Sequence, residues 1–224
     1  IKLDTDFLAK LSILYDKKID SVQQKIWKYA GGQFNISSPA QVQEILFGTL
    51  KIDSTGLKKT KTGISTAASE LDKLRGKHPV VDLMYEYREL TKLKSTYIDA
   101  LPLLVKDDGR LHTSFNQAGT VTGRLSSSNP NLQNIPVRTE LGRRVRGAFV
   151  APKGSVLISA DYSQVELRIL AHVSQDPAFL GAFAAGEDIH ASTASLLFNV
   201  PLEQVTKDMR RLGKTINFGV VYGI

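Results

Sequence analysis

The first half of the chain carries apolar residues at helical spacing, broken by turn residues. Residues 4–30 repeat apolar positions every three or four residues, and the glycines at 31–32 stop the pattern, so the sequence predicts a long helix there. Ser38 begins a capping box with proline at the first helical position. A second helix is therefore predicted from Ser38 to about Gly48.

A polar and basic stretch separates this part from two further helices. Residues 49–65 contain glycine, threonine and lysine with few apolar positions, which indicates a mobile loop. Residues 66–75 and 79–101 return to helical spacing, and Pro102 ends the second of these helices. The first hundred residues are thus predicted to be helical, with a basic tip.

The pattern changes after residue 102. Residues 103–105 and 111–115 flank an Asp-Asp-Gly turn and predict a β-hairpin, whereas residues 116–147 are irregular and polar. Residues 156–160 (VLISA) form a short apolar run that predicts a buried strand leading into Asp161. The predicted strands thus lie between two helical regions.

The last part of the chain returns to helices. A helical pattern follows Asp161, and the chain reads as helical again from Asp176 onward. Asp188 has the position of an N-cap for a helix over residues 189–198, and a last helix covers about 206–222.

Composition narrows the class of protein. The 224 residues are 42% hydrophobic and 23% charged, near the averages of globular domains, which excludes a disordered or collagen-like chain. No apolar run is long enough to cross a membrane, and the first residues carry charges in place of a signal-peptide core. Cysteine is absent, which excludes disulfides and thiolate metal sites and is compatible with a cytoplasmic protein.

The net charge of +7 suggests an anionic partner, but its distribution is more informative than its sign. Four lysines lie within residues 51–61, and four arginines lie within residues 138–146. Two solvated surfaces would give the same pattern, so the clusters alone do not decide.

Asp161 directly follows the predicted strand, which is a common place for a metal ligand. Mg²⁺ prefers oxygen ligands, and one or two carboxylates with substrate phosphates often suffice. The same residue could equally cap the helix that follows, and Glu166 could be an ordinary surface glutamate. The residues alone leave both interpretations open.

Four large side chains recur every four residues along the last predicted helix: Arg210, Lys214, Phe218 and Tyr222. Residues at this spacing lie along one helical face. Two cations beside two aromatic rings would suit a nucleotide, with the cations on the triphosphate and Phe218 against the base. An amphipathic helix with buried rings and snorkelling cations would show the same spacing.

Longer motifs decide between these alternatives. Residues 161–168 (DYSQVELR) and 210–223 (RRLGKTINFGVVYG) closely resemble motifs A and B of family A DNA polymerases, the bacterial DNA polymerase I type. Further matches to the family's signatures are residues 93–97 (LKSTY), 122–127 (TGRLSS), 129–136 (NPNLQNIP) and 188–190 (DIH). The resemblance runs through essentially the whole chain, in the family's order.

This resemblance implies an incomplete right-hand polymerase fold of the α+β class. Residues 1–105 would form a helical thumb, residues 106–175 the first part of the palm with a partial antiparallel sheet, and residues 176–224 the helical start of the fingers. The implied partners are primer–template duplex DNA, gripped by the basic tip at 51–65, and a dNTP. No membrane partner is expected, and the protein is expected to be a monomer.

The resemblance also implies a reaction. A primer 3′-hydroxyl would attack the α-phosphate of a dNTP with the help of two Mg²⁺ ions. Asp161 and the backbone carbonyl of Tyr162 would hold metal. Arg210 and Lys214 would bind the triphosphate, and Lys214 would also act as general acid. With Asp161, these two residues form the implied catalytic set. Phe218 would stack on the nucleotide, which predicts poor incorporation of dideoxynucleotides.

Two further positions complete the implied nucleotide site. Glu166 resembles a steric gate against the ribose 2′-hydroxyl, helped by Tyr222, and His190 resembles another phosphate contact. The full implied set is Gln164, Glu166, His190, Arg210, Lys214, Phe218 and Tyr222.

DNA contacts follow from the same resemblance. Arg124 resembles an arginine in the minor groove near the primer end, joined by Gln164. Contacts to primer and template are implied for Asn131, Gln133 and Asn134, and contacts to the DNA backbone for Lys94, Ser95, Thr96 and Arg138. For the serine and threonine positions, a turn or capping role is an open alternative.

One feature of the family does not occur in the 224 residues. It is the His-Asp-Glu segment of motif C, which carries a second catalytic carboxylate. The chain is therefore expected to be the N-terminal part of the polymerase region of a longer enzyme, and inactive by itself. The alternatives are a non-catalytic DNA-binding fragment and a single-subunit phage-type RNA polymerase. Glu166 argues against the latter, because an RNA polymerase must admit the 2′-hydroxyl.

Overall fold

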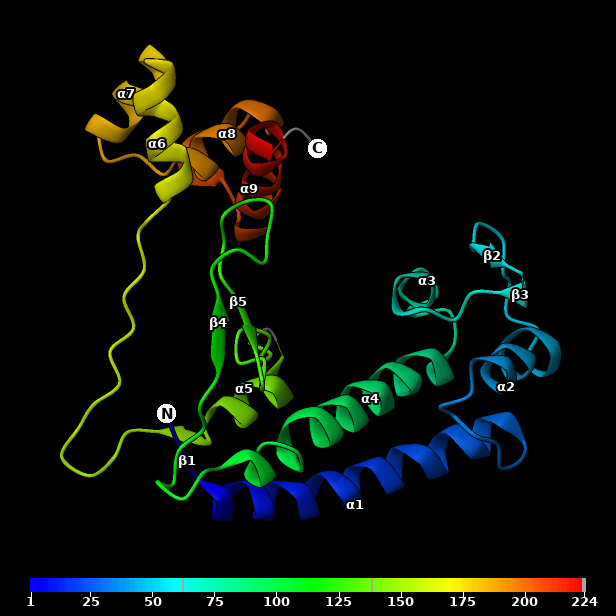
Figure 1. Ribbon diagram of the computed structural model, residues 1–224. Helices are drawn as coiled ribbons and strands as arrows, with labels where there is room; N and C mark the ends of the chain where they lie inside the picture. The colour runs from blue at the N-terminus through cyan, green and yellow to red at the C-terminus, as the bar shows by residue number, and fades with distance from the viewer. Residues whose placement is uncertain (62, 138, 223–224) are drawn as a thin grey trace. The chain divides into compact units, whose positions relative to one another are not determined.

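The computed structural model describes residues 1–61, 63–137 and 139–222. It forms two compact units, Ile1–Leu157 and Ile158–Ile224, and each is described by itself. The chain is rich in helices and has small antiparallel sheets (Figure 1), so the α+β class is confirmed at this level. The division into thumb, palm and fingers stays a prediction. None of the described helices is long and apolar enough to span a membrane.

Helix α1, Thr5–Ala30, begins and ends where the sequence predicts. The Asp4 carboxylate caps it by accepting the Phe7 amide at 2.8 Å. Gly31 ends it with a φ of 75°, a left-handed conformation that glycine adopts without strain. The buried residues of the helix are Leu8, Leu11, Tyr15, Val22, Ile26 and Ala30. They recur at helical spacing, so α1 packs by one apolar face.

The core of the first unit lies where α1 packs beside α4, Pro79–Leu93 (Figure 1). His78 caps α4, because its Nδ1 accepts the Val80 amide at 3.2 Å. Helix α4 continues directly into the π-helix η2, Lys94–Ile98. Together they cover the predicted helix over 79–101 almost completely.

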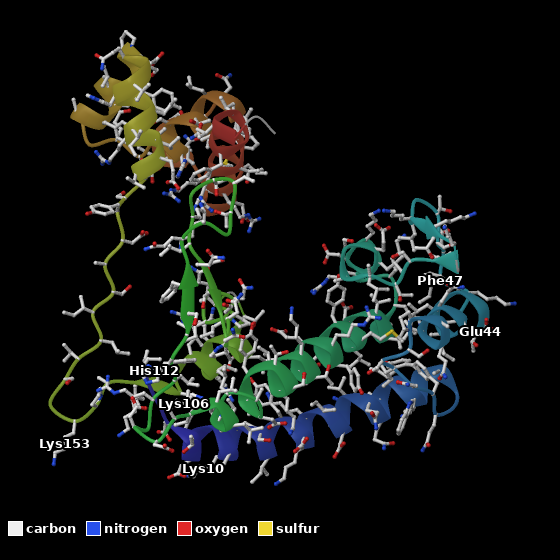
Figure 2. The ribbon with its side chains drawn as sticks, in the orientation of Figure 1. Lys10, Glu44, Phe47, Lys106, His112 and Lys153 are labelled. Carbon is white, nitrogen blue, oxygen red and sulfur yellow. The ribbon has the colours of Figure 1, made fainter. Side chains whose placement is uncertain are left out.

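A second helical segment packs against the same core. It consists of α2, Pro39–Gln43, and the π-helix η1, Glu44–Thr49. The Ser38 side chain caps α2, as the capping box predicts. On η1, Phe47 packs against the core while Glu44 is exposed (Figure 2).

The basic tip is more ordered than a plain loop. Within residues 49–65, strand β2 (Lys59–Thr60) pairs antiparallel with β3 (Gly63–Ile64). Helix α3, Ala68–Asp72, is shorter than the predicted helix over 66–75. The residues after α3 continue as turns with i→i+3 hydrogen bonds, which a helical spacing of apolar residues does not distinguish from a helix.

The predicted hairpin over 103–105 and 111–115 is wrong. Pro102–Leu104 form a 3-10 helix, η3, which proline favours at its first position. The Asp-Asp-Gly turn is present, but the segment after it pairs with the start of the chain. The Leu111 amide donates to the carbonyl of Ile1 at 2.8 Å, so the partner lies far away in the sequence.

The stretch predicted as irregular, 116–147, contains regular elements. Strand β4, Ser114–Asn116, pairs antiparallel with β5, Ser126–Ser128. Helix α5, Glu140–Arg146, is capped by the Thr139 hydroxyl, which accepts the Gly142 amide at 3.1 Å. A third strand pair consists of β1, Lys2–Leu3, and β6, Phe149–Val150.

The predicted buried strand at 156–160 is also wrong. These residues form no strand and are exposed, with Val156 at 78% and Ile158 at 87% of full exposure. An apolar run becomes a buried strand only where neighbouring strands satisfy its backbone and cover its sides. None of the described strands pairs with this segment.

The second unit consists of helices. They are α6, Val165–Ser174; α7, Pro177–Ala184; α8, Ile189–Phe198; the 3-10 helix η4, Leu202–Gln204; and α9, Lys207–Tyr222. The predicted helices over 189–198 and 206–222 are therefore confirmed. Asp188 caps α8, as its position in the sequence predicts, and Asp176 caps α7 in the same way.

Candidate nucleotide and nucleic-acid site

Helices α8 and α9 pack closely because α9 has a glycine at their contact. A Cβ on Gly213 would lie 2.4 Å from the backbone oxygen of His190 and 3.1 Å from the amide nitrogen of Ala194. The first distance is too short for a real contact, so a larger residue would force the helices apart. The close packing brings the start of α8 beside the cationic residues of α9.

Asp188 links the two helices. One carboxylate oxygen accepts the amides of His190 and Ala191 at 3.0 and 3.2 Å, and the other accepts Nε of Arg210 at 2.6 Å. Burial alone would raise the pKa of Asp188, but the hydrogen bond from Arg210 and the two amides together hold it below its usual value. The carboxylate is therefore charged at neutral pH.

His190 is buried beneath α9, with 3% of its surface exposed. Its Nδ1 lies 3.1 Å from Nδ2 of Asn217, whose Oδ1 lies 3.0 Å from the Thr193 hydroxyl. Burial lowers the pKa of His190, and the nearby Arg210 cation adds to this. The imidazole of His190 is therefore neutral, and the side-chain amide of Asn217 holds it on one side.

The structure shows part of the predicted row of cations and aromatic rings along α9. Lys214 Nζ lies 5.7 Å from the centre of the Phe218 ring, and that ring lies 5.8 Å from the His190 ring. The structure thus brings Arg210, Lys214, Phe218 and His190 together. Tyr222 ends α9, but its side chain lies outside the described part of the chain.

Asp161 and Tyr162 lie on the exposed segment before α6. Asp161 does not cap that helix, because the N-cap is Gln164, with a left-handed φ of 54°. Glu166 lies in the first turn of α6. Carboxylate and peptide oxygens suit Mg²⁺, but the described residues contain no group of three His, Cys, Asp or Glu that could hold a metal. Asp161 and Tyr162 therefore fit only part of a metal site.

A hollow in the first unit gathers three of the predicted DNA contacts. Thr96, Asn131 and Asn134 line a cavity of about 580 Å³ together with Lys92 and apolar residues. Lys92 is absent from the sequence-predicted set. It precedes Thr96 by four residues, and that helical spacing next to the LKSTY motif was the available signal.

The predicted DNA residues of the first unit differ in the contacts that they already make within the protein. The side-chain oxygen of Asn131 accepts the amides of Gln133 and Asn134 at 3.0 and 3.2 Å, so it shapes a turn. Gln133 is exposed, and so is Arg124, in the loop between β4 and β5. Arg138 lies outside the described residues.

Lys94 is engaged within the protein. Its ammonium donates to Asp99 at 2.7 Å and to the Ser12 hydroxyl at 2.9 Å, and it lies 3.3 Å from Asp16. The hydrogen bond with Asp99 raises the pKa of Lys94. A DNA phosphate would have to compete with two carboxylates for this cation. Ser95, the next residue on η2, is exposed.

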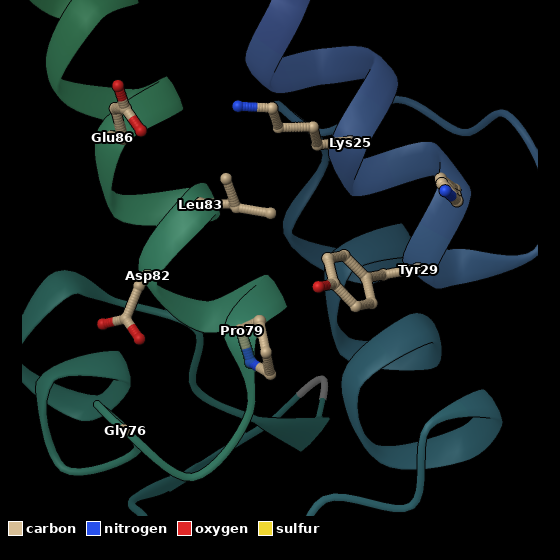
Figure 3. Close-up of a pocket in the computed structure, with 8 residues that line it drawn as sticks. Lys25, Tyr29, Gly76, Pro79, Asp82, Leu83 and Glu86 are labelled. Atoms are coloured by element: carbon tan, nitrogen blue, oxygen red, sulfur yellow. The ribbon is translucent and has the colours of Figure 1, made fainter.

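Another pocket lies between the last turns of α1 and the start of α4 (Figure 3). It has a volume of about 780 Å³, and Lys25 and Tyr29 face it from α1, opposite Asp82 and Glu86 on α4. None of the described residues predicted from the motifs lines it. The pocket is lined by both lysines and carboxylates, so its charge does not indicate an anion-binding site.

Sequence reasoning missed the residues that hold the candidate site together. Gly213 and Asn217 both contact α8 and are four residues apart, so they lie on one face of α9. Glycine and asparagine are weak helix formers, and their presence inside a predicted helix was the available signal. The roles of Asp188 and Thr193 toward α9 had no signal in the sequence.

Comparisons with known proteins agree with the motifs. The family model described as DNA polymerase family A matches residues 5–224. The whole chain is 52% identical to DNA polymerase I of Synechocystis sp. and also to the thermostable DNA polymerase I of Thermus thermophilus, and it covers 23% and 27% of those proteins. The chain thus spans about a quarter of the length of the curated relatives it matches.

A solved structure has a similar fold. The POL domain of Pol1 from M. smegmatis, in complex with DNA primer–template and dNTP, superimposes with a TM-score of 0.87 at 43% sequence identity. The match covers all of this chain and 39% of that one. On the extent of the family match and the identity to its members, the chain belongs to DNA polymerase family A.

Proposed function

We propose that this chain is part of a DNA-directed DNA polymerase that transfers dNMP from a dNTP to a primer 3′-hydroxyl. The observation that carries the proposal is the α8–α9 face, where Arg210, Lys214, Phe218 and His190 come together. Two cations and a ring fit a nucleoside triphosphate better than a neutral ligand. The names of the relatives and the DNA and dNTP bound to the structural neighbour support the same assignment.

In this proposal, the residues of α9 stabilise the charge that moves during the reaction. Arg210 and Lys214 bind the triphosphate, and their charge offsets the negative charge that grows on the pyrophosphate as the bond to the α-phosphorus breaks. Lys214 then gives a proton to the leaving oxygen. Phe218 stacks on the nucleotide and limits its position.

Asp161 and Tyr162 are proposed to hold the catalytic metal, which we assign as Mg²⁺. When bound, Mg²⁺ would activate the primer hydroxyl and stabilise the leaving oxygen. Asp161 supplies a hard carboxylate donor on an exposed segment, where substrate phosphates can share the coordination. Glu166, with Tyr222, is proposed to exclude the ribose 2′-hydroxyl, and Gln164 to contact both substrates.

The first unit is proposed to bind primer–template DNA. The hollow lined by Lys92, Thr96, Asn131 and Asn134 offers a cation and neutral hydrogen-bonding groups together, a combination that suits a DNA backbone. Arg124 and Gln133 are proposed as further contacts, and the basic tip as a grip on the duplex. Binding should therefore weaken as salt rises. We expect the enzyme to act as a monomer in the cytoplasm.

Primer extension by the longer enzyme that contains this segment tests the proposal. We expect Lys214→Ala to reduce extension with dNTPs by at least about a hundredfold, since it removes a general acid and a charge on the triphosphate. Lys207→Ala is the matched control, because Lys207 is exposed at the start of the same helix. Equal rates for the two variants would refute the assignment of Lys214.

The same assay separates the alternatives. In the longer enzyme, equal use of rNTPs and dNTPs would favour an RNA polymerase, and DNA binding without any extension would favour a non-catalytic module. The 224-residue chain is expected to bind DNA without extending a primer. Extension by this chain that is lost in Asp161→Asn would refute its proposed inactivity.

A further inference from the structure

Asp188 fixes the direction of Arg210 through one carboxylate. Its first oxygen is held by two main-chain amides of α8, and its second oxygen accepts Nε of Arg210 at 2.6 Å. Because the amides belong to a helix, the carboxylate cannot turn freely. The Arg210 guanidinium therefore has one fixed point of attachment, and its plane is limited by that hydrogen bond.

Among the residues that the structure describes, the other donors of Arg210 have no hydrogen-bond acceptor. A guanidinium has five N–H donors in one plane, and Asp188 takes only the one on Nε. Among the described residues, the two terminal amino groups of Arg210 make no hydrogen bond, and 42% of the side chain is exposed. These two groups present the edge that matches two oxygens of a phosphate.

We propose that Asp188 is a positioning residue that holds Arg210 by Nε and leaves its two terminal amino groups for the triphosphate of the incoming nucleotide. The inference rests on the proposed function and deepens it. Sequence reasoning assigned Asp188 only as the cap of α8, and the structure adds the second contact. A preset guanidinium binds a phosphate with less loss of side-chain entropy than a free one.

Whether removal of Asp188 tightens or weakens nucleotide binding distinguishes a positioning role from a purely electrostatic one. Asp188 is anionic at neutral pH, since its pKa is held low, and an anion near a triphosphate repels it. If Asp188 acted only as a charge, its removal would tighten nucleotide binding. If Asp188 positions Arg210, its removal weakens binding, because the freed guanidinium must be ordered by the nucleotide itself.

The test compares Asp188→Asn with Asp208→Asn in the longer polymerase. Asp208 pairs with Arg211 at 3.2 Å on the same helix and is 80% exposed, so its variant makes the same change of charge without touching Arg210. We expect Asp188→Asn to raise KM for dNTP about tenfold, with a smaller change in kcat. Asp208→Asn should leave KM unchanged or lower it slightly. A KM that falls or stays constant in Asp188→Asn overturns the proposal.

The variant Asp188→Ser tests whether a rise in KM results only from a loss of folding. Serine still caps a helix, but its shorter side chain does not reach Arg210, so KM should rise as in the asparagine variant while the melting temperature stays near that of Asp188→Asn. A raised KM that follows the melting temperature across the variants, including Asp208→Asn, would indicate a structural role and overturn the proposal.

A measurement on the 224-residue chain is independent of catalysis. In ¹⁵N NMR spectra, the Nε–H of Arg210 should exchange slowly with water because a carboxylate holds it, and the signal should weaken by exchange in Asp188→Ser. Fast exchange in the unmodified chain overturns the proposal. The two assays can also disagree. If the longer enzyme used no dNTP but the Nε–H of Arg210 was still protected, the proposed function would be refuted and the Asp188–Arg210 pairing would stand.

Discussion

Replacing Gly213 by alanine should separate α8 from α9. The added Cβ would lie 2.4 Å from the carbonyl oxygen of His190, whereas ordinary contact begins at 3.4 Å, so the helices must move apart by the difference, about 1 Å. The oxygen belongs to the backbone and cannot rotate away. Overpacking of this kind costs about 1–3 kcal/mol, and alanine gains about 1 kcal/mol over glycine in a helix. Because the obstacle is rigid, we take the upper value for overpacking. We therefore expect the free energy of unfolding to fall by about 2 kcal/mol.

Hydrogen exchange measured by mass spectrometry on the 224-residue chain can assign this loss to the second unit. Amides of α8 and α9 should exchange about thirtyfold faster in Gly213→Ala, the factor that corresponds to about 2 kcal/mol. Gly181→Ala is the matched control, because Gly181 lies in α7 and a Cβ there meets nothing within 4 Å. That variant should exchange more slowly than the unmodified chain. If Gly213→Ala behaved like the control, the close packing inferred at α8 would be refuted.

Three further predictions concern ionisable side chains. Lys94→Met removes the cation that Asp99 and Asp16 share and should lower the stability of the first unit by about 1 kcal/mol in urea denaturation; a loss that did not shrink in concentrated salt would contradict an ionic cause. His190 has a lowered pKa in the folded chain, so the unfolded chain binds the proton more readily, and the stability of the second unit should fall as pH drops below about 6.5. The fall should be absent in His190→Gln, and its persistence there would assign it to another group. Asp161 is exposed, so Asp161→Asn should leave the melting temperature unchanged while abolishing metal-dependent extension by the longer enzyme; a large drop in melting temperature would contradict its exposed position.

Local signals allowed much of the helical framework to be predicted. Asp4 and Gly31 mark the two ends of α1 because a helix end needs a side chain or a left-handed residue within a few positions. The same holds for Asp188 at the start of α8. These interactions join residues close in the sequence, so a pattern along the chain records them directly.

Non-local packing could not be predicted in the same way. Residues 111–115 follow a correctly predicted turn, yet Leu111 bonds to Ile1, and no turn signal encodes a partner 110 positions away. The contacts of Asn217 with His190 depend on how α9 crosses α8. The motif marks Arg210 and Lys214 by resemblance, but the carboxylate that orients Arg210 becomes visible only in three dimensions.

The exposed apolar stretch at 156–158 affects how the chain behaves in solution. Val156, Leu157 and Ile158 are 78%, 57% and 87% exposed on a backbone that no described strand pairs. Such a stretch can pair with the same stretch of a second molecule. The net charge of +7 opposes this self-association by mutual repulsion. Added salt screens that repulsion, so the conditions that weaken DNA binding should also favour aggregation of the chain.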